Sequence, residues 1–430
     1  MSKRNFILLT IILVIAVLLV FLFLFTRKNT TTPGVNGTGT NFISTFPTGN
    51  NTTTPPNTTP PANVSGYIPP ASATTAKLIK VSTMPIAGFG VYSKERLKDP
   101  LNSKLTEFAP SLRYVARATG NIYETFADKI NEQQFSATVI PKVYEAYFGN
   151  SGNSVVMRYL KADNQTIETF VGSLPKEYLG TAVTGDAVVK GTFLPEDTED
   201  MSLSPDASSI FYLFNSSSTA GDTVVGDTLN LAANKKAQIF TSPFTEWLSS
   251  WPSNNSVSKM ITLTTKPASG IPGYMYSMNP SGANLIQEVF GNINGLTTLT
   301  SPNGKLALYA DDNLSLSVYH LDTKTSGLMG VKTLPEKCAW GGGSDVVYCA
   351  VPRSIPAGAY PDSWYQGGAS FSDQIWKIDV KTGNATMLAD PLAISGGQDI
   401  DGIKLALDSG ENYLFFVNKK DSFLWELGLK

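Results

Sequence analysis

The sequence of 430 residues contains one histidine, two cysteines and only 16% charged residues. One histidine cannot form a histidine-rich metal site or an imidazole relay, and two cysteines cannot supply a cysteine-rich zinc site. His320 lies in a predicted β-strand, and no Gly-x-Ser-x-Gly elbow of a serine hydrolase occurs anywhere in the chain. We therefore expect no catalytic histidine, no metal centre and no cofactor.

Charge is scarce at the N-terminal end. The only charged residues in the first 76 positions are Lys3, Arg4, Arg27 and Lys28. Of the 33 basic residues, 29 therefore remain against all 35 acidic ones, so residues 77–430 carry a formal charge of −6. A mildly acidic body does not attract nucleic acid or an anionic membrane surface. We expect no nucleic-acid partner.

Residues 6–25 form an apolar run whose only polar member is Thr10. At about 1.5 Å per residue, a helix of this length spans the roughly 30 Å hydrocarbon core of a bilayer. The run ends in bulky and then basic residues, unlike the short core and small-residue site of a cleaved signal peptide. We predict a cytoplasmic tail (residues 1–5), an uncleaved single-pass transmembrane helix (residues 6–26), and a body at the cell surface or in the periplasm. The balanced flanking charges do not fix this orientation.

The next segment, residues 27–76, is dominated by Thr, Asn, Pro and Gly and is uncharged from Asn29 onward. Such a composition buries too little apolar surface to fold, and its prolines favour an extended chain. We predict a disordered stalk between the membrane and the body. Several Asn-x-Thr/Ser triplets, which a glycosylating host can modify, begin at Asn29, Asn36, Asn51, Asn57 and Asn63.

Beyond residue 77, short β-rich runs recur after clusters of turn residues, which is the signature of a repeat fold. Ser-Pro-Asp at 204–206 and Ser-Pro-Asn at 301–303 each precede an apolar strand. These units resemble the blades of TolB-type and WD-repeat-like β-propellers, most fully over residues 296–334. The resemblance implies four strands per blade, the first of them innermost.

We predict an all-β, seven-bladed propeller over residues 77–430, with six or eight blades as alternatives. Seven units correspond to about 51 residues each, close to the length of propeller repeats. The last unit has only three predicted strands, and residues 77–82 have the form of the missing outer strand. Pairing the two would close the ring and hide an otherwise exposed edge.

Cys338 and Cys349 flank a turn whose centre falls between Gly343 and Ser344. In an antiparallel hairpin the two residues would face each other, with Cβ atoms close enough for a disulfide after modest closure. A bridge here would suit an oxidising compartment. The alternative is a pair of buried free thiols.

A long connection, residues 352–373, follows within the same unit. Loops of this length are often functional, and in propellers such a connection emerges on the face that usually binds partners. Its side chains suit a protein or a sugar partner. The candidate binding residues are Arg353, Tyr360, Trp364, Tyr365, Gln366 and Phe371. The alternative is a lid whose aromatic side chains merely bury one another.

Other conspicuous residues have plainer interpretations. Acidic clusters at 196–200, 311–312 and 399–402 are typical of solvated turns, and Trp247 with Trp251 suits packing between blades.

The sequence thus favours recognition over catalysis: a membrane-anchored module for binding or scaffolding in the cell envelope. One alternative is a glycan-acting hydrolase or lyase with carboxylates at the channel mouth, which requires Asp or Glu side chains to converge with Arg or Tyr. Another is a structural subunit of an envelope complex, with an apolar patch on its outer strands.

Overall fold

The computed structural model describes residues 77–99, 102–177, 179, 185, 187–218, 221–253, 260–281, 286–394 and 396–430. The predicted tail, transmembrane helix and stalk (residues 1–5, 6–26 and 27–76) lie outside these described residues. Within the described residues, no helix has the length and apolar character needed to cross a bilayer.

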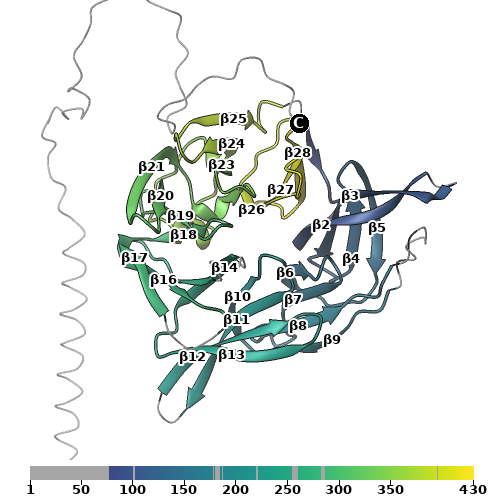
Figure 1. Cartoon of the computed structure of the whole chain (residues 1–430), viewed down its shortest axis with the longest axis horizontal. Coiled ribbons are helices and arrows are strands. Elements are labelled where there is room, and N and C mark those ends of the chain that lie inside the picture. The colour runs from purple at the N-terminus through teal and green to yellow at the C-terminus, as the bar shows by residue number, and fades with distance from the viewer. Residues whose placement is uncertain are drawn as a thin grey trace, which may run out of the picture. The chain divides into compact units, whose positions relative to one another are not determined.

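The described residues form seven antiparallel sheets of four strands each, arranged as a ring (Figure 1). The prediction of an all-β, seven-bladed propeller is confirmed. We number the sheets as blades in chain order. Blade 1 contains β2 (Ile86–Asp99), β3 (Asn102–Ala116), β4 (Ile122–Phe126) and β5 (Lys129–Ser136). Blade 2 contains β6 (Val143–Gly149), β7 (Ser154–Leu160), β8 (Ile167–Ser173) and β9 (Lys190–Phe193).

Blades 3 to 6 follow the same plan. Blade 3 contains β10 (Thr198–Leu203), β11 (Ser209–Ser218), β12 (Gly221–Asn230) and β13 (Lys235–Ser242). Blade 4 contains β14 (Trp247–Ser253), β15 (Met260–Thr265), β16 (Pro272–Met278) and β17 (Ile286–Asn294). Blade 5 contains β18 (Thr297–Thr300), β19 (Leu306–Ala310), β20 (Ser315–His320) and β21 (Thr325–Lys332). Blade 6 contains β22 (Cys338–Trp340), β23 (Val346–Pro352), β24 (Asp373–Asp379) and β25 (Ala385–Ala389), after the short 3-10 helix η1 (Pro335–Lys337).

Blade 7 is assembled from both ends of the described chain. It contains β26 (Gly402–Leu407), β27 (Tyr413–Asn418) and β28 (Leu424–Gly428), and its fourth strand is β1 (Leu78–Lys80). β1 pairs antiparallel with β28, placing Leu78 opposite Leu427. Strands from both ends of the described chain therefore share one sheet, which closes the ring and leaves β28 without an unpaired edge.

The first strand of each blade lies innermost, as the labels of β2, β6, β10, β14 and β18 show in Figure 1. Because strands alternate in direction, the ring has two distinct faces. We call the face with the second-to-third-strand and blade-to-blade connections the loop face. We call the opposite face, which carries the first-to-second and third-to-fourth turns, the turn face.

The Ser-Pro-Asp/Asn motifs form the tight turns between first and second strands. Ser204 Oγ donates to Asp206 Oδ1 at 2.6 Å, and Ser301 Oγ lies 2.7 Å from Asn303 Oδ1. In both turns the same serine oxygen accepts the amide of the residue five positions later. The motif satisfies backbone groups that the turn would otherwise leave unpaired, which explains its place before an apolar strand.

Apolar side chains fill the space between neighbouring blades. Phe211 and Leu213 of blade 3 pack against Trp247, Trp251 and Ile261 of blade 4, and both tryptophans are buried. The two tryptophans therefore do pack between blades.

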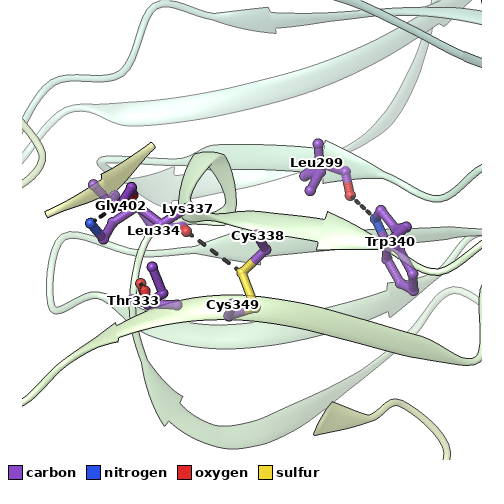
Figure 2. Close-up of a disulfide and its surroundings, with 9 residues drawn as sticks. Leu299, Thr333, Leu334, Lys337, Cys338, Trp340, Cys349 and Gly402 are labelled. Carbon is purple, nitrogen blue, oxygen red and sulfur yellow. Dashed lines mark hydrogen bonds between the residues drawn. A yellow bond between two sulfur atoms is a disulfide. The ribbon is translucent and has the colours of Figure 1, made fainter. Parts of the chain in front are cut away.

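Cys338 of β22 lies directly opposite Cys349 of β23, and the two form a disulfide (Figure 2). The predicted bridge is confirmed. It sits in the apolar layer between blades 5 and 6, beside Trp340, whose indole Nε1 donates to Leu299 O of β18 at 3.1 Å. The bridge thus fixes the inner hairpin of blade 6 where that blade meets its neighbour.

Candidate functional site

The long connection between β23 and β24 folds over the loop face and includes the short helix α2 (Asp362–Tyr365). Its contacts reach three other parts of the ring. Asp362 Oδ2 accepts the Ser269 amide of blade 4 at 2.8 Å. The Tyr365 hydroxyl donates to Glu336 of η1, and Lys419 of blade 7 donates to the carbonyl of Trp364. The connection therefore ties blade 6 to blades 4 and 7.

Three of the six candidate binding residues form the apolar underside of this connection. Tyr360, Trp364 and Phe371 are 4%, 4% and 1% exposed. Phe371 stacks on both other rings, with centroid distances of 5.7 Å to Tyr360 and 6.3 Å to Trp364. They pack with Leu314 and Leu334 from the neighbouring connections. These three aromatic side chains hold the loop down and are not presented to solvent.

The other three candidates lie nearer the surface. Tyr365 is 40% exposed, Gln366 is exposed, and Arg353 forms an ion pair with Asp390. The structure therefore separates the six residues into a buried group and a surface group. A binding role for Arg353, Tyr360, Trp364, Tyr365, Gln366 and Phe371 stays a prediction.

A buried ion cluster lies beneath the loop. Lys337 Nζ is 2.7 Å from Asp373 Oδ2 and 2.5 Å from Asp401 Oδ1, and all three side chains are fully buried. Burial raises the pKa of Asp373 to about 6 despite the attraction of Lys337. Burial also opposes ionisation of Asp401, but Lys337 and the hydrogen bonds from Phe371 and Trp364 together hold the pKa of that carboxyl below its ordinary value. Such a cluster locks the connection to blade 7 and is closed to solvent.

A second group of ionisable side chains gathers at the inner strands, towards the loop face. We call it the axial cluster, and it contains Glu145 and Tyr147 of β6, Arg158 of β7, Asp200 of β10 and Lys404 of β26. Unlike the Lys337 cluster, it includes partly exposed side chains, among them Glu145, Asp200 and Lys404. Four strands of three blades thus contribute to one polar site.

Glu145 is the centre of this cluster. Its carboxylate lies 2.7 Å from Arg158 Nη1, accepts the Tyr147 hydroxyl at 2.8 Å, and lies 3.8 Å from Lys404 Nζ. Burial opposes ionisation of Glu145, but Lys404, Arg158 and the hydrogen bond from Tyr147 together hold its pKa below the ordinary value. Glu145 is therefore a fixed anion between two cations.

Asp200 behaves differently, because burial raises its pKa to about 6. Its Oδ2 accepts the backbone amide of Ser249 at 2.5 Å, which favours the anion, while the nearby charge of Glu145 disfavours it. Burial likewise lowers the pKa of Lys404. The Lys337 cluster has the same opposing pKa shifts, so the partial exposure of its side chains is what distinguishes the axial cluster as a candidate site.

This cluster was not predicted from the sequence, where Asp200 was assigned to a solvated turn at 196–200; it lies instead on the inner strand β10. A positional signal nevertheless exists. Glu145, Asp200, Ser249 and Lys404 are each the third residue of an inner strand. That equivalence is visible only when the strand boundaries are known. Blades 1 and 2 lack the Ser-Pro-Asp motif, so the register of Glu145 could not be assigned from the sequence.

Comparisons with known proteins relate the ring to solved structures alone. No protein-family model and no curated protein matches the sequence. The structure of an oligogalacturonate lyase from Vibrio parahaemolyticus is 7% identical, with a TM-score of 0.51, and the match covers 86% of this chain and 97% of that one. A structure of an oligogalacturonate lyase in complex with manganese is 8% identical, with a TM-score of 0.50, covering 84% and 95%. At such identities the likeness concerns the fold.

The manganese in the second structure raises the question of a metal centre here. Among the residues that the structure describes, no three His, Cys, Asp or Glu side chains lie close enough together to hold a metal ion. His320 lies on β20, the third strand of blade 5, and the axial carboxylates are already engaged by Arg158, Lys404 and the Ser249 amide. The described residues do not fit such a centre, and the chemistry below uses none.

Proposed function

We propose that this protein is a binding module of the cell envelope, with an extracytoplasmic propeller held at the membrane by its N-terminal segment. The ligand is an oligosaccharide, taken at the axial cluster on the loop face. The observation that carries the proposal is the convergence of Glu145, Arg158, Asp200 and Lys404 from three blades at one mouth of the ring. Tethering would raise the local concentration of the module at the surface.

The chemistry of the cluster suits a polyhydroxylated ligand. Carboxylates accept hydrogen bonds from sugar hydroxyls, and the cations donate to ring and carboxylate oxygens of a sugar acid. The ion pairs between Glu145, Arg158 and Lys404 hold these groups in place before a ligand arrives, which lowers the ordering cost of binding. The loop over blades 4, 6 and 7 limits access, so the ligand would enter above blades 1 to 3.

Calorimetric titration of the full chain with defined oligosaccharides tests this proposal. Oligogalacturonides are the first probe because of the structural likeness, and uncharged oligosaccharides of equal length are the second. Binding of either, weakened by Asp200→Asn, is expected. The matched control is the double variant E95Q/D222N, which neutralises two exposed carboxylates outside the cluster. If none of the oligosaccharides binds, the assignment of a glycan ligand is wrong.

The predicted topology has its own test. Protease added to intact cells should cleave the segment between residues 27 and 76 and release the disulfide-containing ring. Protection of the chain in intact cells, with cleavage only after lysis, would contradict an extracytoplasmic body.

A lyase is the second candidate, favoured by the two carboxyl groups beside Arg158, Tyr147 and Lys404. In elimination from a uronate, a base removes the proton next to the sugar carboxylate. The electron pair forms a carbon–carbon double bond as the neighbouring glycosidic C–O bond breaks, and the leaving oxygen takes up a proton. Asp200, with a pKa of about 6, suits the base, and the cations suit the sugar carboxylate. A rise in ultraviolet absorbance from the new conjugated bond, abolished in Asp200→Asn, would support catalysis. Binding without this rise would leave the protein a binding module.

A further inference from the structure

A cavity of about 350 Å³ opens on the turn face, at the seam between blade 1 and blade 7. Its position follows from its lining, which includes the β4–β5 turn of blade 1 and the β26–β27 turn of blade 7. The lining includes Arg96, Glu107, Phe108, Asp128, Tyr413 and Lys430. Its volume is near the lower end of about 300–1,000 Å³ that is usual for small-molecule sites.

One wall of this seam cavity is a projecting hairpin. β3 pairs with β4 only as far as Ser111 opposite Phe126, whereas β2 and β3 remain paired out to Asp99 and Asn102. The hairpin therefore extends beyond its own blade and carries Phe108 to the rim of the cavity, where that side chain is 73% exposed. A large apolar ring exposed beside a cavity has no structural role in the core.

The cavity is lined by equal numbers of positively and negatively charged side chains. Arg96 donates from Nη1 and Nη2 to the two carboxylate oxygens of Asp128 at 2.7 and 2.5 Å, and from Nε to Glu107 at 2.9 Å. Lys430 Nζ donates to Gly410 O at 2.9 Å and to Asn412 Oδ1 at 2.7 Å. Two cationic and two anionic side chains thus line one small space, and their formal charges sum to zero.

We propose that the seam cavity binds a neutral pyranose sugar. Phe108 and Tyr413 offer aromatic rings to the apolar C–H face of a pyranose. The carboxylates are held in fixed directions by Arg96, and the Lys430 ammonium by Gly410 O and Asn412 Oδ1, so that these groups can meet its hydroxyl groups. An anionic ligand would face Glu107 and Asp128, and a cationic one would face Arg96 and Lys430, so the balance of charge selects an uncharged polar molecule.

This site is independent of the axial cluster. The two lie on opposite faces of the ring and share no residue. A protein that holds sugars at both faces would bridge two chains of a glycan, and such bivalent capture strengthens retention without new contacts at either site.

The test is titration of the full chain, in a detergent without a sugar head group, with methyl glycosides of glucose, galactose, mannose and N-acetylglucosamine, followed by saturation-transfer NMR. At least one of these neutral probes should bind. Phe108→Ala should weaken that binding about fivefold, in line with the loss of one aromatic contact. Its melting temperature should match that of the wild type, because the Phe108 side chain is mostly exposed.

Two controls make the outcome decisive. Leu105→Ala removes an exposed apolar side chain from the same hairpin, outside the cavity lining, and should leave binding unchanged. Asp200→Asn in the axial cluster should also leave it unchanged, which separates this site from the proposed function. Failure of all four glycosides to bind overturns the inference. Equal loss of binding in Phe108→Ala and Leu105→Ala overturns it as well.

Discussion

Lys404 of blade 7 and Glu145 of blade 2 meet across the intervening blade 1, with Nζ 3.8 Å from Oε1. The Lys404 ammonium also donates to the carbonyl of Ala87 on β2 at 3.0 Å, so all three inner strands are joined. Gly88 follows on β2, where a Cβ atom would lie 2.0 Å from the carbonyl oxygen of Ala146. Only glycine lets β2 and β6 approach this closely.

Gly88→Ala should therefore lower the free energy of unfolding by about 1–3 kcal/mol, because the added methyl group must push β2 away from β6. Equilibrium denaturation would measure this loss. Gly327→Ala is the control, since a Cβ there meets only Val318 at 3.8 Å, an ordinary contact. Equal stability of the two variants would show that β2 and β6 do not pack as described.

Truncation of Trp364 should cost far more stability than truncation of its neighbour Tyr365. Trp364 is buried, donates its indole N–H to Asp401 at 3.1 Å, and has Lys419 Nζ 4.2 Å from its ring centroid. Trp364→Ala should cost about 3–5 kcal/mol in thermal or chemical denaturation. Tyr365→Ala should cost much less, because its ring is partly exposed. Unchanged stability of Trp364→Ala would instead support a tryptophan held for a partner.

Removing the disulfide should destabilise the ring moderately. Cys338 and Cys349 are 11 residues apart, and cross-linking a loop of this length lowers the entropy of the unfolded chain. Reduction, or the double variant C338A/C349A, should therefore lower the free energy of unfolding by about 2–3 kcal/mol. Reductant should have no effect on the double variant. Two titratable thiols in denatured, unreduced protein would contradict the bridge.

Glu426 should make stability fall as pH rises. Burial raises its pKa to about 8, and the attraction of Lys77 does not cancel this shift, to which repulsion from Asp128 and Asp408 adds. Its Oε2 has no hydrogen-bond partner. Between the ordinary value of 4.5 and about 8, the unfolded chain loses this proton more readily than the folded one. The free energy of unfolding therefore falls as pH rises through that window. Below the window both states keep the proton, and Glu426 does not reduce stability.

Glu426→Gln removes this dependence. Its stability relative to the wild type should increase steadily from about pH 4.5 to pH 8, measured by denaturation at each pH. Glu95→Gln, at an exposed position, should follow the wild type throughout. A constant difference between Glu426→Gln and the wild type would mean that this carboxyl ionises normally.

The blades were predictable from the sequence because their information is local. The motif at Ser204–Asp206 fixes a turn through its own hydrogen bonds, and the symmetric spacing of Cys338 and Cys349 fixes a hairpin register. Both signals need only a dozen residues of chain. The same reasoning could list the aromatic residues of the long connection but could not tell which would be buried, because Trp364 is covered by contacts with Asp401 and Lys419, distant in sequence.

The axial cluster was beyond such reasoning. Glu145, Asp200 and Lys404 come from three inner strands, and their neighbourhood depends on closure of the whole ring. In the sequence Glu145 and Lys404 are each one charged residue in an ordinary strand, and Asp200 is the last residue of an acidic run. Their shared feature, the third position of an inner strand, appears only after all strands are aligned.

The central claim is tested most directly by calorimetric titration of oligosaccharides into the wild type and the Asp200→Asn variant. The asparagine side chain has nearly the same shape, and its oxygen can still accept the hydrogen bond from the Ser249 N–H. If the axial cluster is the ligand site, affinity should fall about tenfold or more, as expected for loss of a charged hydrogen bond. The control E95Q/D222N should bind like the wild type. Equal affinity of Asp200→Asn and the wild type for every oligosaccharide that binds would contradict the account.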